Sequence, residues 1–359
     1  MQKRYITIIV TVYNIAPYLD RFFQNLKAQT FSDYEALIID DGSADDSLGI
    51  CEKYAAEDDR IRVIALEHVG ISQARNIALE NIRTPFVTSL DGDDYFDNDC
   101  LKHLVDAQKK YDADMVLSNV IFRSEALEET SRFVPRAAAV YEGERIKEEL
   151  PGLLVENRLN YLYGKLYRAE LLSGVRVEPD VMQGSDTMIN CQYVVKAKRI
   201  AVTEDFDYSY IRYQSRSVTS YKGDLYFIRL VRINKYLRDL MREHDLYTEE
   251  MERAIDIRIV LSAKRALARL AGVKLSKRKK HEKAREIAEN SEFVSSYERL
   301  SKYGTDLIGE RTVAPDEAIS YVDECTAVYR DKETEEKAEA MRGRYPDVII
   351  RLYKKINRR

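Results

Sequence analysis

Three carboxylates stand within four positions in the stretch SLDGDDYFD, directly after an apolar segment that is typical of a buried strand. Asp91 and Asp93 flank Gly92, and Asp94 follows them. Crowded carboxylates repel one another unless a cation or several hydrogen-bond donors hold them. Oxygen ligands without thiolates suit Mg²⁺ or Mn²⁺, which proteins bind through one or two carboxylates together with substrate phosphates. The stretch therefore indicates a divalent cation site.

Gly92 also favours a ligand site at the acidic cluster. A residue without Cβ lets a ligand approach closely and adopts φ values that other residues resist. The alternative is a surface turn whose acids cap the next helix. An EF-hand does not fit, because the ligand series of that loop and its terminal Glu are missing.

A second acidic stretch, IIDDGSADDS, also follows an apolar strand-like segment. A carboxylate in that position is well placed to accept N–H or O–H hydrogen bonds from a base or a ribose. We expect Asp41 to be the ligand in this stretch. Asp45, Asp46 and Ser47 have the pattern of residues that cap a following helix.

The segments around these polar stretches alternate between strand and helix signals. A nearly continuous β-branched run, YITIIVTVY, is typical of a strand buried on both faces. Such alternation predicts a parallel, doubly wound sheet. We expect strands at 5–13, 35–43 and 61–66 and just before the acids at 91–94, with helices at 17–29, 47–57 and from about 72.

The polar residues fall where such a sheet binds its ligand. Asn14, the segment 40–43 and the segment 91–94 each follow the carboxyl end of an expected strand. In open α/β sheets the ligand crevice lies just outside those ends. Three loops should therefore converge on one pocket.

The rest of the chain changes character in two steps. We expect a helix at 99–111, a strand at 113–122 and a polar loop at 123–135. Beyond about residue 222 the sequence becomes charged and helix-periodic. We therefore expect a Rossmann-like α/β domain at 1–222 and a helical region at 223–359, which would contact an oligomer partner, an acceptor or a membrane surface.

Several of these segments together resemble a known family. TIIVTVYN, QTFSDYEALIIDDGSADDS, GISQARNIAL and FVTSLDGDDYF occur in the order and spacing of the family 2 glycosyltransferases of the GT-A fold. KLYRAELL, GSDTMIN and YSYIRYQSRSVT extend the resemblance through about residue 220. The resemblance implies an α/β GT-A fold and transfer of a sugar from a nucleotide diphosphate donor to an acceptor hydroxyl, with inversion at the anomeric carbon. It also implies a place in bacterial cell-surface glycan synthesis.

The resemblance assigns donor-binding roles to four residues. Thr11 and Tyr13 match the positions whose backbone and ring hold the uridine, so a UDP-sugar is the expected donor. Asp41 matches the acid that accepts the uracil N–H. Arg75 matches an arginine that closes the nucleotide pocket.

The acids at 91–94 match the DxD motif of the family. Asp93 is the expected direct ligand of Mn²⁺ or Mg²⁺, and Asp91 is a second ligand nearer the ribose, with Gly92 between them. Asp94 is expected to be structural. A divalent cation neutralises the negative charge that develops on a diphosphate leaving group.

A base is also needed to take the proton of the acceptor hydroxyl. In QGSDTMIN, Asp186 matches the catalytic Asp of the family, and we expect it in the first turn of a helix capped by Ser185. A helix N-terminus favours an ionised carboxylate. Relatives usually carry Glu where this chain has Ser185, and the alternative for Asp186 is a capping acid with no catalytic role.

Other features narrow the type of enzyme. The chain has no Trp and therefore lacks the QxxRW motif of processive members, which indicates the non-processive branch. In that branch Arg212 would either approach the diphosphate or form a structural ion pair. His68 and His103 have no evident ligand partner and are expected to be solvated or core residues.

Composition limits the partners and the compartment. A net charge of −4 over 359 residues gives no reason to expect nucleic acid as a partner. The four cysteines lie far apart without a CxxC pair, as is typical of reduced thiols in a cytoplasmic protein. The N-terminal apolar run is too short for a signal peptide, and no run of about 18 apolar residues predicts a membrane span.

The sequence ends in YPDVIIRLYKKINRR, where apolar residues repeat at helical spacing among arginines and lysines. Such a helix either packs on the protein's own helices or a second subunit, or lies in the headgroup layer of an anionic membrane. Acceptors in this family are often glycans on lipid carriers at the inner face of the membrane, so peripheral attachment there is one expectation.

Two other function classes stay open. A nucleotidyltransferase would show a Gly-rich phosphate loop after the first strand, which TVYNIAPYL lacks. A catalytically inactive relative would serve as a binding or assembly partner. The presence of Asp41, Asp93 and Asp186 argues against an inactive relative, whereas Ser185 leaves it open.

Overall fold

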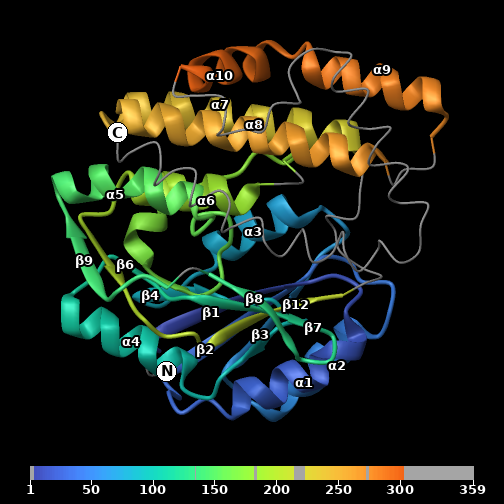
Figure 1. Cartoon of the computed structure of the whole chain (residues 1–359). Coiled ribbons are helices and arrows are strands. Elements are labelled where there is room, and N and C mark those ends of the chain that lie inside the picture. The colour runs from blue at the N-terminus through green and yellow to red at the C-terminus, as the bar shows by residue number, and fades with distance from the viewer. Residues whose placement is uncertain (1–3, 134, 182–183, 214–222, 272–274, 303–359) are drawn as a thin grey trace. The chain divides into compact units, whose positions relative to one another are not determined.

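The computed structural model describes residues 4–133, 135–181, 184–213, 223–271 and 275–302 of the chain (Figure 1). These residues divide into two compact units. Unit 1 runs from 4 to 146 and from 159 to 213, and unit 2 consists of 147–158 and the described residues from 223 onward. The domain boundary expected between residues 222 and 223 lies at the edge of a segment outside the described residues, and it stays a prediction.

The core of unit 1 is an eight-stranded sheet in the order β3-β2-β1-β4-β10-β6-β11-β9. The first four strands of that order run parallel to one another. β1, with the sequence ITIIVTV, is almost wholly buried, as expected for a parallel strand with helices over both faces. The predicted α/β class with a mostly parallel sheet is therefore confirmed. The four strands are β1 (Ile6–Val12), β2 (Tyr34–Asp40), β3 (Ile61–Ala65) and β4 (Phe86–Ser89).

Helices cover both faces of this sheet. α1 (Ala16–Lys27) and α2 (Ser47–Glu57) lie on one face, and α3 (Ile71–Glu80) lies on the other (Figure 1). The apolar residues of α1 recur at the i, i+3, i+4, i+7 spacing that gives a helix one apolar face. All four of them are buried: Leu19, Phe22, Phe23 and Leu26.

The second half of unit 1 completes the large sheet and builds a smaller one. β10 runs antiparallel to both of its neighbours, β4 and β6. The smaller sheet has four strands in the order β5-β12-β7-β8. The remaining strands of the large sheet are β6 (Met115–Leu117), β9 (Ala139–Glu142), β10 (Lys165–Arg168) and β11 (Arg199–Val202), and the smaller sheet has β5 (Tyr95–Phe96), β7 (Val120–Ser124), β8 (Glu129–Arg132) and β12 (Tyr208–Arg212). The helices of this half are α4 (Cys100–Tyr111), the 3₁₀ turn η1 (Ala169–Leu172) and α6 (Ser185–Val194).

Two expectations for this half are wrong. The single strand expected at 113–122 is divided between the sheets, with β6 in the large one and β7 in the small one. The division falls at Ser118 and Asn119, whose backbone N–H groups donate to the carbonyls of Gly164 and Asp205. The polar loop expected at 123–135 contains β8, which pairs antiparallel with β7. Its sequence, ETSR, is wholly polar and gave no apolar strand signal.

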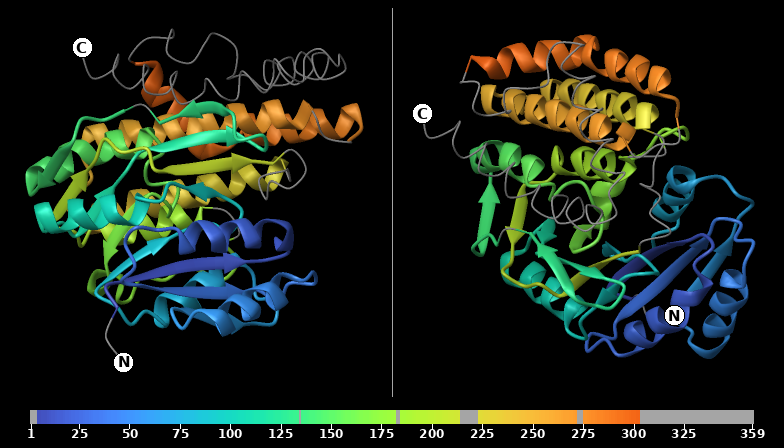
Figure 2. Two further views of the ribbon diagram at one scale, coloured as in Figure 1. Left: turned by 90° about the horizontal axis from the view of Figure 1, so that it is seen from below. Right: turned by 45° about the vertical axis from the view of Figure 1, so that its right-hand side comes forward.

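Unit 2 is helical, and the predicted helical C-terminal region is confirmed over its described residues. α8 packs against α7, α9 and α10 (Figure 2). The buried carboxylate of Asp256 on α8 accepts hydrogen bonds from Arg299 at 2.6 and 2.7 Å and from Arg238 at 3.3 Å. The helices are α7 (Gly223–Glu243), α8 (Glu249–Ala271), α9 (Lys277–Ala288) and α10 (Ser291–Ser301). Along the chain, α5 (Glu144–Val155) passes from unit 1 into unit 2 after Ile146.

None of the helices in the described part of the chain is both long enough and apolar enough to cross a membrane. The basic stretch at the end of the sequence lies outside the described residues, so neither of its two expected uses is tested.

Candidate active site

The order of strands in the large sheet reverses direction beside β1. From β1 the chain proceeds to β2 and β3 on one side and then returns to β4 on the other side. Open α/β sheets bind ligands outside the carboxyl ends of their strands at such a switch point. β1 ends at Val12 and β4 ends at Ser89, so Tyr13 and the acid loop, which we define as residues 91–94, both follow this edge.

Asp94 holds the acid loop against the smaller sheet. Its carboxylate accepts a hydrogen bond from the Tyr208 hydroxyl at 2.6 Å and another from the backbone N–H of Ile211 at 2.7 Å. The side chain is buried. Burial, followed by the charges of Asp91 and Asp93, raises the pKa of Asp94 well above its ordinary value. Asp94 is therefore the structural acid of the loop, as the sequence indicated.

Asp93 is fixed through its backbone. Its carbonyl oxygen accepts hydrogen bonds from the Arg21 guanidinium and from the Tyr213 hydroxyl, each at 2.6 Å. Arg21 also donates to the Tyr213 hydroxyl at 2.9 Å, so each of the three groups is hydrogen-bonded to the other two. Burial raises the pKa of the Asp93 carboxyl, while a backbone hydrogen bond and the charge of Arg21 act to lower it. The backbone contacts leave the carboxylate itself available for a ligand.

Asp91 lies where several charges meet. Burial, followed by the charge of Asp93, raises the pKa of Asp91 to about 7. The guanidinium of Arg75 lowers this pKa and the carboxylate of Asp186 raises it further. These four residues come from the acid loop, α3 and α6, and the structure brings them close enough for each charge to act on Asp91.

Gly92 does not have the conformation expected from the sequence. Its φ is not positive, in contrast to Gly42 at +70° and Gly184 at +82°. A Cβ atom at position 92 would lie 2.7 Å from Cδ1 of Ile15 and 3.3 Å from Cδ2 of Leu19. The expectation of an unusual φ is therefore wrong. The start of α1 packs directly on the acid loop, and a larger residue at position 92 would require the Ile15 side chain to move.

Asp186 stands in the first turn of α6, as expected. Its Oδ1 accepts a hydrogen bond from the Arg75 guanidinium at 2.5 Å, and the same guanidinium nitrogen donates to the Ser185 hydroxyl. Ser185 is not the cap of this helix, contrary to the expectation. The N-cap is Gly184, and the Ser185 side chain is buried against Arg75. Arg75 thus contacts the candidate base directly, and its expected role in closing a nucleotide pocket stays a prediction.

Asp41 holds a loop of unit 1 in place. Its carboxylate accepts hydrogen bonds from the backbone N–H of Val69 at 2.7 Å and from that of Gly70 at 3.1 Å. Gly42, beside it, has φ +70°, and a Cβ there would lie 2.6 Å from the backbone nitrogen of His68. The turn after β2 therefore packs tightly on the loop before α3. The His68 imidazole also lies 3.1 Å from this carboxylate. Since a carboxylate has lone pairs for about four hydrogen bonds, Val69, Gly70 and His68 leave room for one further N–H.

Tyr13 and Thr11 stand at the carboxyl end of β1. Thr11 is opposite Ile39 of β2 and is partly buried. The ring of Tyr13 stacks on the imidazole of His68, with 4.4 Å between centroids and an interplanar angle of 19°. Tyr13 is 46% exposed, so aromatic surface faces solvent at the switch point.

Three further residues differ from what the sequence suggested. Arg212 lies over the Phe122 ring and donates to the Ser131 hydroxyl at 3.3 Å, so it packs within the smaller sheet. Both histidines have carboxylate partners, contrary to the expectation. His68 lies 3.1 Å from Asp41, and His103 lies 3.0 Å from Asp207. The partner of His103 is 104 positions away in sequence, so spacing did not indicate it.

The acid loop suits a divalent cation. The three carboxyl groups all have raised pKa values, chiefly because burial disfavours their charged forms, and neighbouring acids raise the values of Asp91 and Asp94 further. A bound cation would favour the charged forms, and the ligands offered by Asp91 and Asp93 are oxygens alone. Such ligands fit Mg²⁺ or Mn²⁺.

Comparison with known proteins identifies the part of the chain that carries this site. Residues 7–171 match the family model described as Glycosyl transferase family 2. This match confirms the resemblance inferred from the sequence motifs over residues 7–171, and the motifs GSDTMIN and YSYIRYQSRSVT lie beyond it. It includes β1 to β4 and the acid loop, and it ends before Asp186.

Two curated relatives are each similar to 57% of the chain. The first is the uncharacterized glycosyltransferase EpsJ of Bacillus subtilis, which is 29% identical over 210 residues, or 57% of this chain and 60% of that protein. The second is the glycosyltransferase GlyA of Streptococcus pneumoniae, which is 29% identical over 211 residues, or 57% of this chain and 30% of that protein. The chain therefore spans less than two thirds of the length of either relative.

The fold is similar to that of S. aureus TarS. The crystal structure of TarS residues 1–349 aligns with a TM-score of 0.63 at 19% sequence identity, over 91% of each chain. The complex of the same protein with UDP-GlcNAc aligns with a TM-score of 0.61. At this level of identity the likeness supports the fold, which agrees with the predicted GT-A class.

Proposed function

Because residues 7–171 belong to glycosyl transferase family 2, we propose that this chain transfers a sugar from a nucleotide diphosphate sugar to an acceptor hydroxyl. We propose a UDP-sugar as the donor, in keeping with the UDP-GlcNAc complex of the similarly folded TarS. The transfer would invert the anomeric carbon, since one carboxylate would activate the acceptor and no covalent intermediate is needed.

One observation carries the proposal. The charges of Asp93, Arg75 and Asp186 all act on the carboxyl group of Asp91, at the edge of the sheet where ligands bind. Two acids for a cation, a guanidinium and a candidate base therefore stand in one place, although they come from three separate segments. Structural packing alone does not explain such a set of partly exposed charges at a strand end.

The nucleoside would bind on the β1 and β2 side of this edge. The exposed ring surface of Tyr13 offers a stacking partner for a uracil ring. Asp41 would accept the uracil N–H with the lone pair that Val69, Gly70 and His68 leave unused. The backbone of Thr11, at the end of β1, would fix the ribose side of the nucleoside.

The diphosphate would lie over the acid loop. Asp93 and Asp91 would hold Mn²⁺ or Mg²⁺, and when bound this ion supplies neutralisation of the charge that develops on the departing diphosphate. The tight packing of Ile15 on Gly92 and the hydrogen bonds to Asp94 hold the loop in one conformation. The ligands are therefore positioned before the donor arrives, which lowers the entropic cost of binding.

Asp186 would act as the general base. Its carboxylate would take the proton of the acceptor hydroxyl while that oxygen forms a bond to the anomeric carbon. The bond from the anomeric carbon to the diphosphate oxygen breaks, and UDP leaves with the electron pair. Arg75, which donates to Oδ1 of Asp186 at 2.5 Å, would orient the carboxylate during this transfer.

We propose that the chain acts in cell-surface glycan synthesis on a glycan or lipid-linked glycan acceptor, in the cytoplasm at the inner face of the membrane. An inactive assembly partner remains the second candidate, because Ser185 stands where relatives usually carry Glu.

Donor hydrolysis and sugar transfer by the Asp186→Asn variant test the role of the base. Asparagine is nearly isosteric but cannot take up the proton, so turnover should fall by about 10²–10⁴-fold while the affinity for UDP changes little. Thermal unfolding is measured alongside, because Arg75 loses its charge partner in this variant. The exposed acid Asp106, changed to Asn, is the matched control.

Two results would argue against parts of this proposal. Near-normal turnover by Asp186→Asn would show that another residue is the base. Absence of hydrolysis of any nucleotide sugar by the unaltered chain with Mn²⁺, together with tight UDP binding, would favour the inactive partner.

A further inference from the structure

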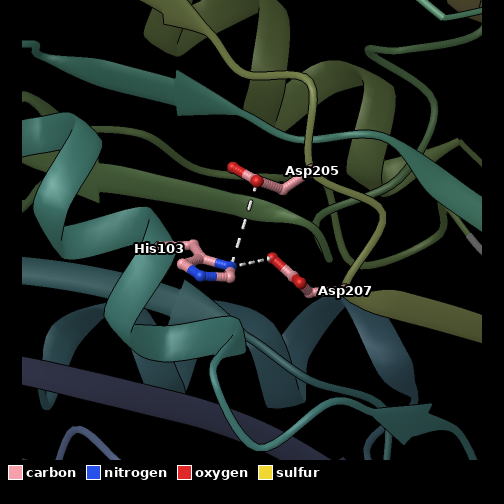
Figure 3. A group of neighbouring side chains, drawn as sticks. All are labelled: His103, Asp205 and Asp207. Carbon is pink, nitrogen blue, oxygen red and sulfur yellow. Dashed lines mark hydrogen bonds and ion pairs between the residues drawn. The ribbon is translucent and has the colours of Figure 1, made fainter.

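A second group of potential metal ligands lies outside the proposed catalytic site. His103 on α4 faces Asp205 and Asp207, which stand in the connection between β11 and β12 (Figure 3). Its Nδ1 atom lies 3.0 Å from a carboxylate oxygen of Asp207 and 4.0 Å from one of Asp205. One ligand atom from each residue lies within 4.8 Å of the other two.

The backbone under this group is anchored at both ends. The carbonyl of Asp205 accepts a hydrogen bond from the N–H of Asn119 at 2.8 Å, and the carbonyl of Asp207 accepts one from the N–H of Asp97 at 2.8 Å. Asn119 is wholly buried. The two carboxylates are therefore held on the same side of α4 by contacts that do not involve their side chains.

Negative charge exceeds positive charge around the imidazole. The charges of Asp207, Asp205 and Asp99 all act on His103, and those of Asp97 and Asp99 act on each other. Among the described residues, the positive charges that act on Asp97 are those of Arg123 and His103. Lys102 acts on Asp99. The charges that act on the His103 imidazole itself are all carboxylates, so the surroundings of the imidazole are acidic, as a divalent cation requires.

From these ligands and this charge we propose that His103, Asp205 and Asp207 bind a divalent transition-metal ion such as Zn²⁺ or Co²⁺. One imidazole nitrogen with two carboxylate oxygens suits these ions better than Mg²⁺ or Ca²⁺, which prefer oxygen alone. Ligand distances of about 2.0–2.2 Å allow two ligand atoms of one ion to lie up to about 4.3 Å apart. The ligand atoms lie within 4.8 Å of one another, so metal binding would require a small rotation of Asp205, whose side chain is 40% exposed.

The ion would take the place of the proton between Nδ1 and Asp207. With three protein ligands, further coordination positions remain for water. The site is separate from the acid loop in its ligands, and its existence does not depend on the proposed sugar transfer.

The position of the site gives it a structural consequence. Asp207 directly precedes β12, whose Tyr208 hydroxyl and Ile211 N–H hold Asp94 of the acid loop. A metal ion between α4 and Asp207 would fix the start of β12. We therefore infer that this ion stabilises the strand that positions the acid loop.

Titration with Co²⁺ tests the proposal, because its visible absorption reports the ligands and geometry. The experiment uses the full chain carrying Asp91→Asn and Asp93→Asn, so that the acid loop does not contribute a second site. In this background we expect one bound Co²⁺ per chain and a rise in Tm of a few degrees at saturation. Adding His103→Gln should weaken binding by at least about 10–100-fold, the range typical of losing even an outer-shell partner.

The exposed His244, changed to Gln in the same background, is the matched control and should leave Co²⁺ binding unchanged. If His103→Gln does not fold, Asp205→Asn at the more exposed carboxylate takes its place. Absence of Co²⁺ binding in the acid-loop background, or binding that neither His103→Gln nor Asp205→Asn weakens, would overturn the proposal.

Discussion

Replacing Asp91 with Asn should stabilise the metal-free protein at alkaline pH while it weakens metal-dependent donor binding. Burial and the neighbouring charge of Asp93 raise the pKa of Asp91 from 3.8 to about 7. The folded protein therefore disfavours the ionised carboxylate that the proposed metal site requires. A residue kept for binding at the expense of stability should show both effects in one variant.

The size of the change in the free energy of unfolding follows from the pKa shift of Asp91, and its pH dependence follows from the sign of that shift. Between about pH 4 and pH 7 the folded state holds a proton on Asp91 that the unfolded state has released, so stability falls as the pH rises through this window. A shift of about 3 units at about 1.4 kcal/mol each gives an upper limit of about 4 kcal/mol. Since Asp91 is partly exposed, we expect about 2 kcal/mol. Asn does not titrate, so the Asp91→Asn variant should be more stable than the unaltered protein at pH 8 and equally stable at pH 4.

Urea unfolding at pH 4 and pH 8 in EDTA measures this difference between the two proteins. The fully solvated Asp59, whose side chain is 88% exposed, gives a matched Asp→Asn control that should change stability by less than about 0.5 kcal/mol. A variant Asp91→Asn that is less stable than the unaltered protein at pH 8, or whose effect is the same at both pH values, would refute the reasoning.

Two further predictions concern packing and the end of the chain. Gly92→Ala should destabilise the fold by about 1 kcal/mol, because the new Cβ lies 2.7 Å from Cδ1 of Ile15 and this flexible side chain must shift. Ile15→Val removes that atom and should recover part of the loss in urea unfolding, whereas no recovery would show that the clash is elsewhere. If the basic end of the chain binds membranes, the full chain should sediment with anionic vesicles and a chain that ends at Tyr345 should not. Equal sedimentation of both forms would favour packing or oligomer contact instead.

The sequence predicted the parts of the fold that depend on local pattern. β1 to β4 and α1 to α3 were expected close to their observed bounds, because continuous β-branched runs and helical apolar spacing are local signals. The expectation that the polar loops follow the carboxyl ends of the strands needed only the order of these elements. Asp186 was correctly expected in the first turn of a helix, because the start of a helix is also a local signal.

Contacts between distant segments could not be predicted in this way. The strand at 113–122 divides because the backbone N–H groups of Ser118 and Asn119 form hydrogen bonds with segments more than 40 positions away. Hydrophobic periodicity does not predict such long-range hydrogen bonds. The pairing of Arg75 with Ser185 and Asp186 joins α3 to α6 and required the fold itself. His103 was judged without partners because both of its carboxylates lie about a hundred positions further along the chain.

The central claim is that the acid loop binds the donor nucleotide through a divalent cation. Calorimetric titration of UDP into the unaltered chain with Mn²⁺, the same chain with EDTA, and an Asp93→Ala variant with Mn²⁺ tests it most directly. We predict clear binding in the first case and binding weaker by at least about tenfold in the other two, with the variant folded by its thermal unfolding. Equal affinity for UDP in all three titrations would contradict the claim.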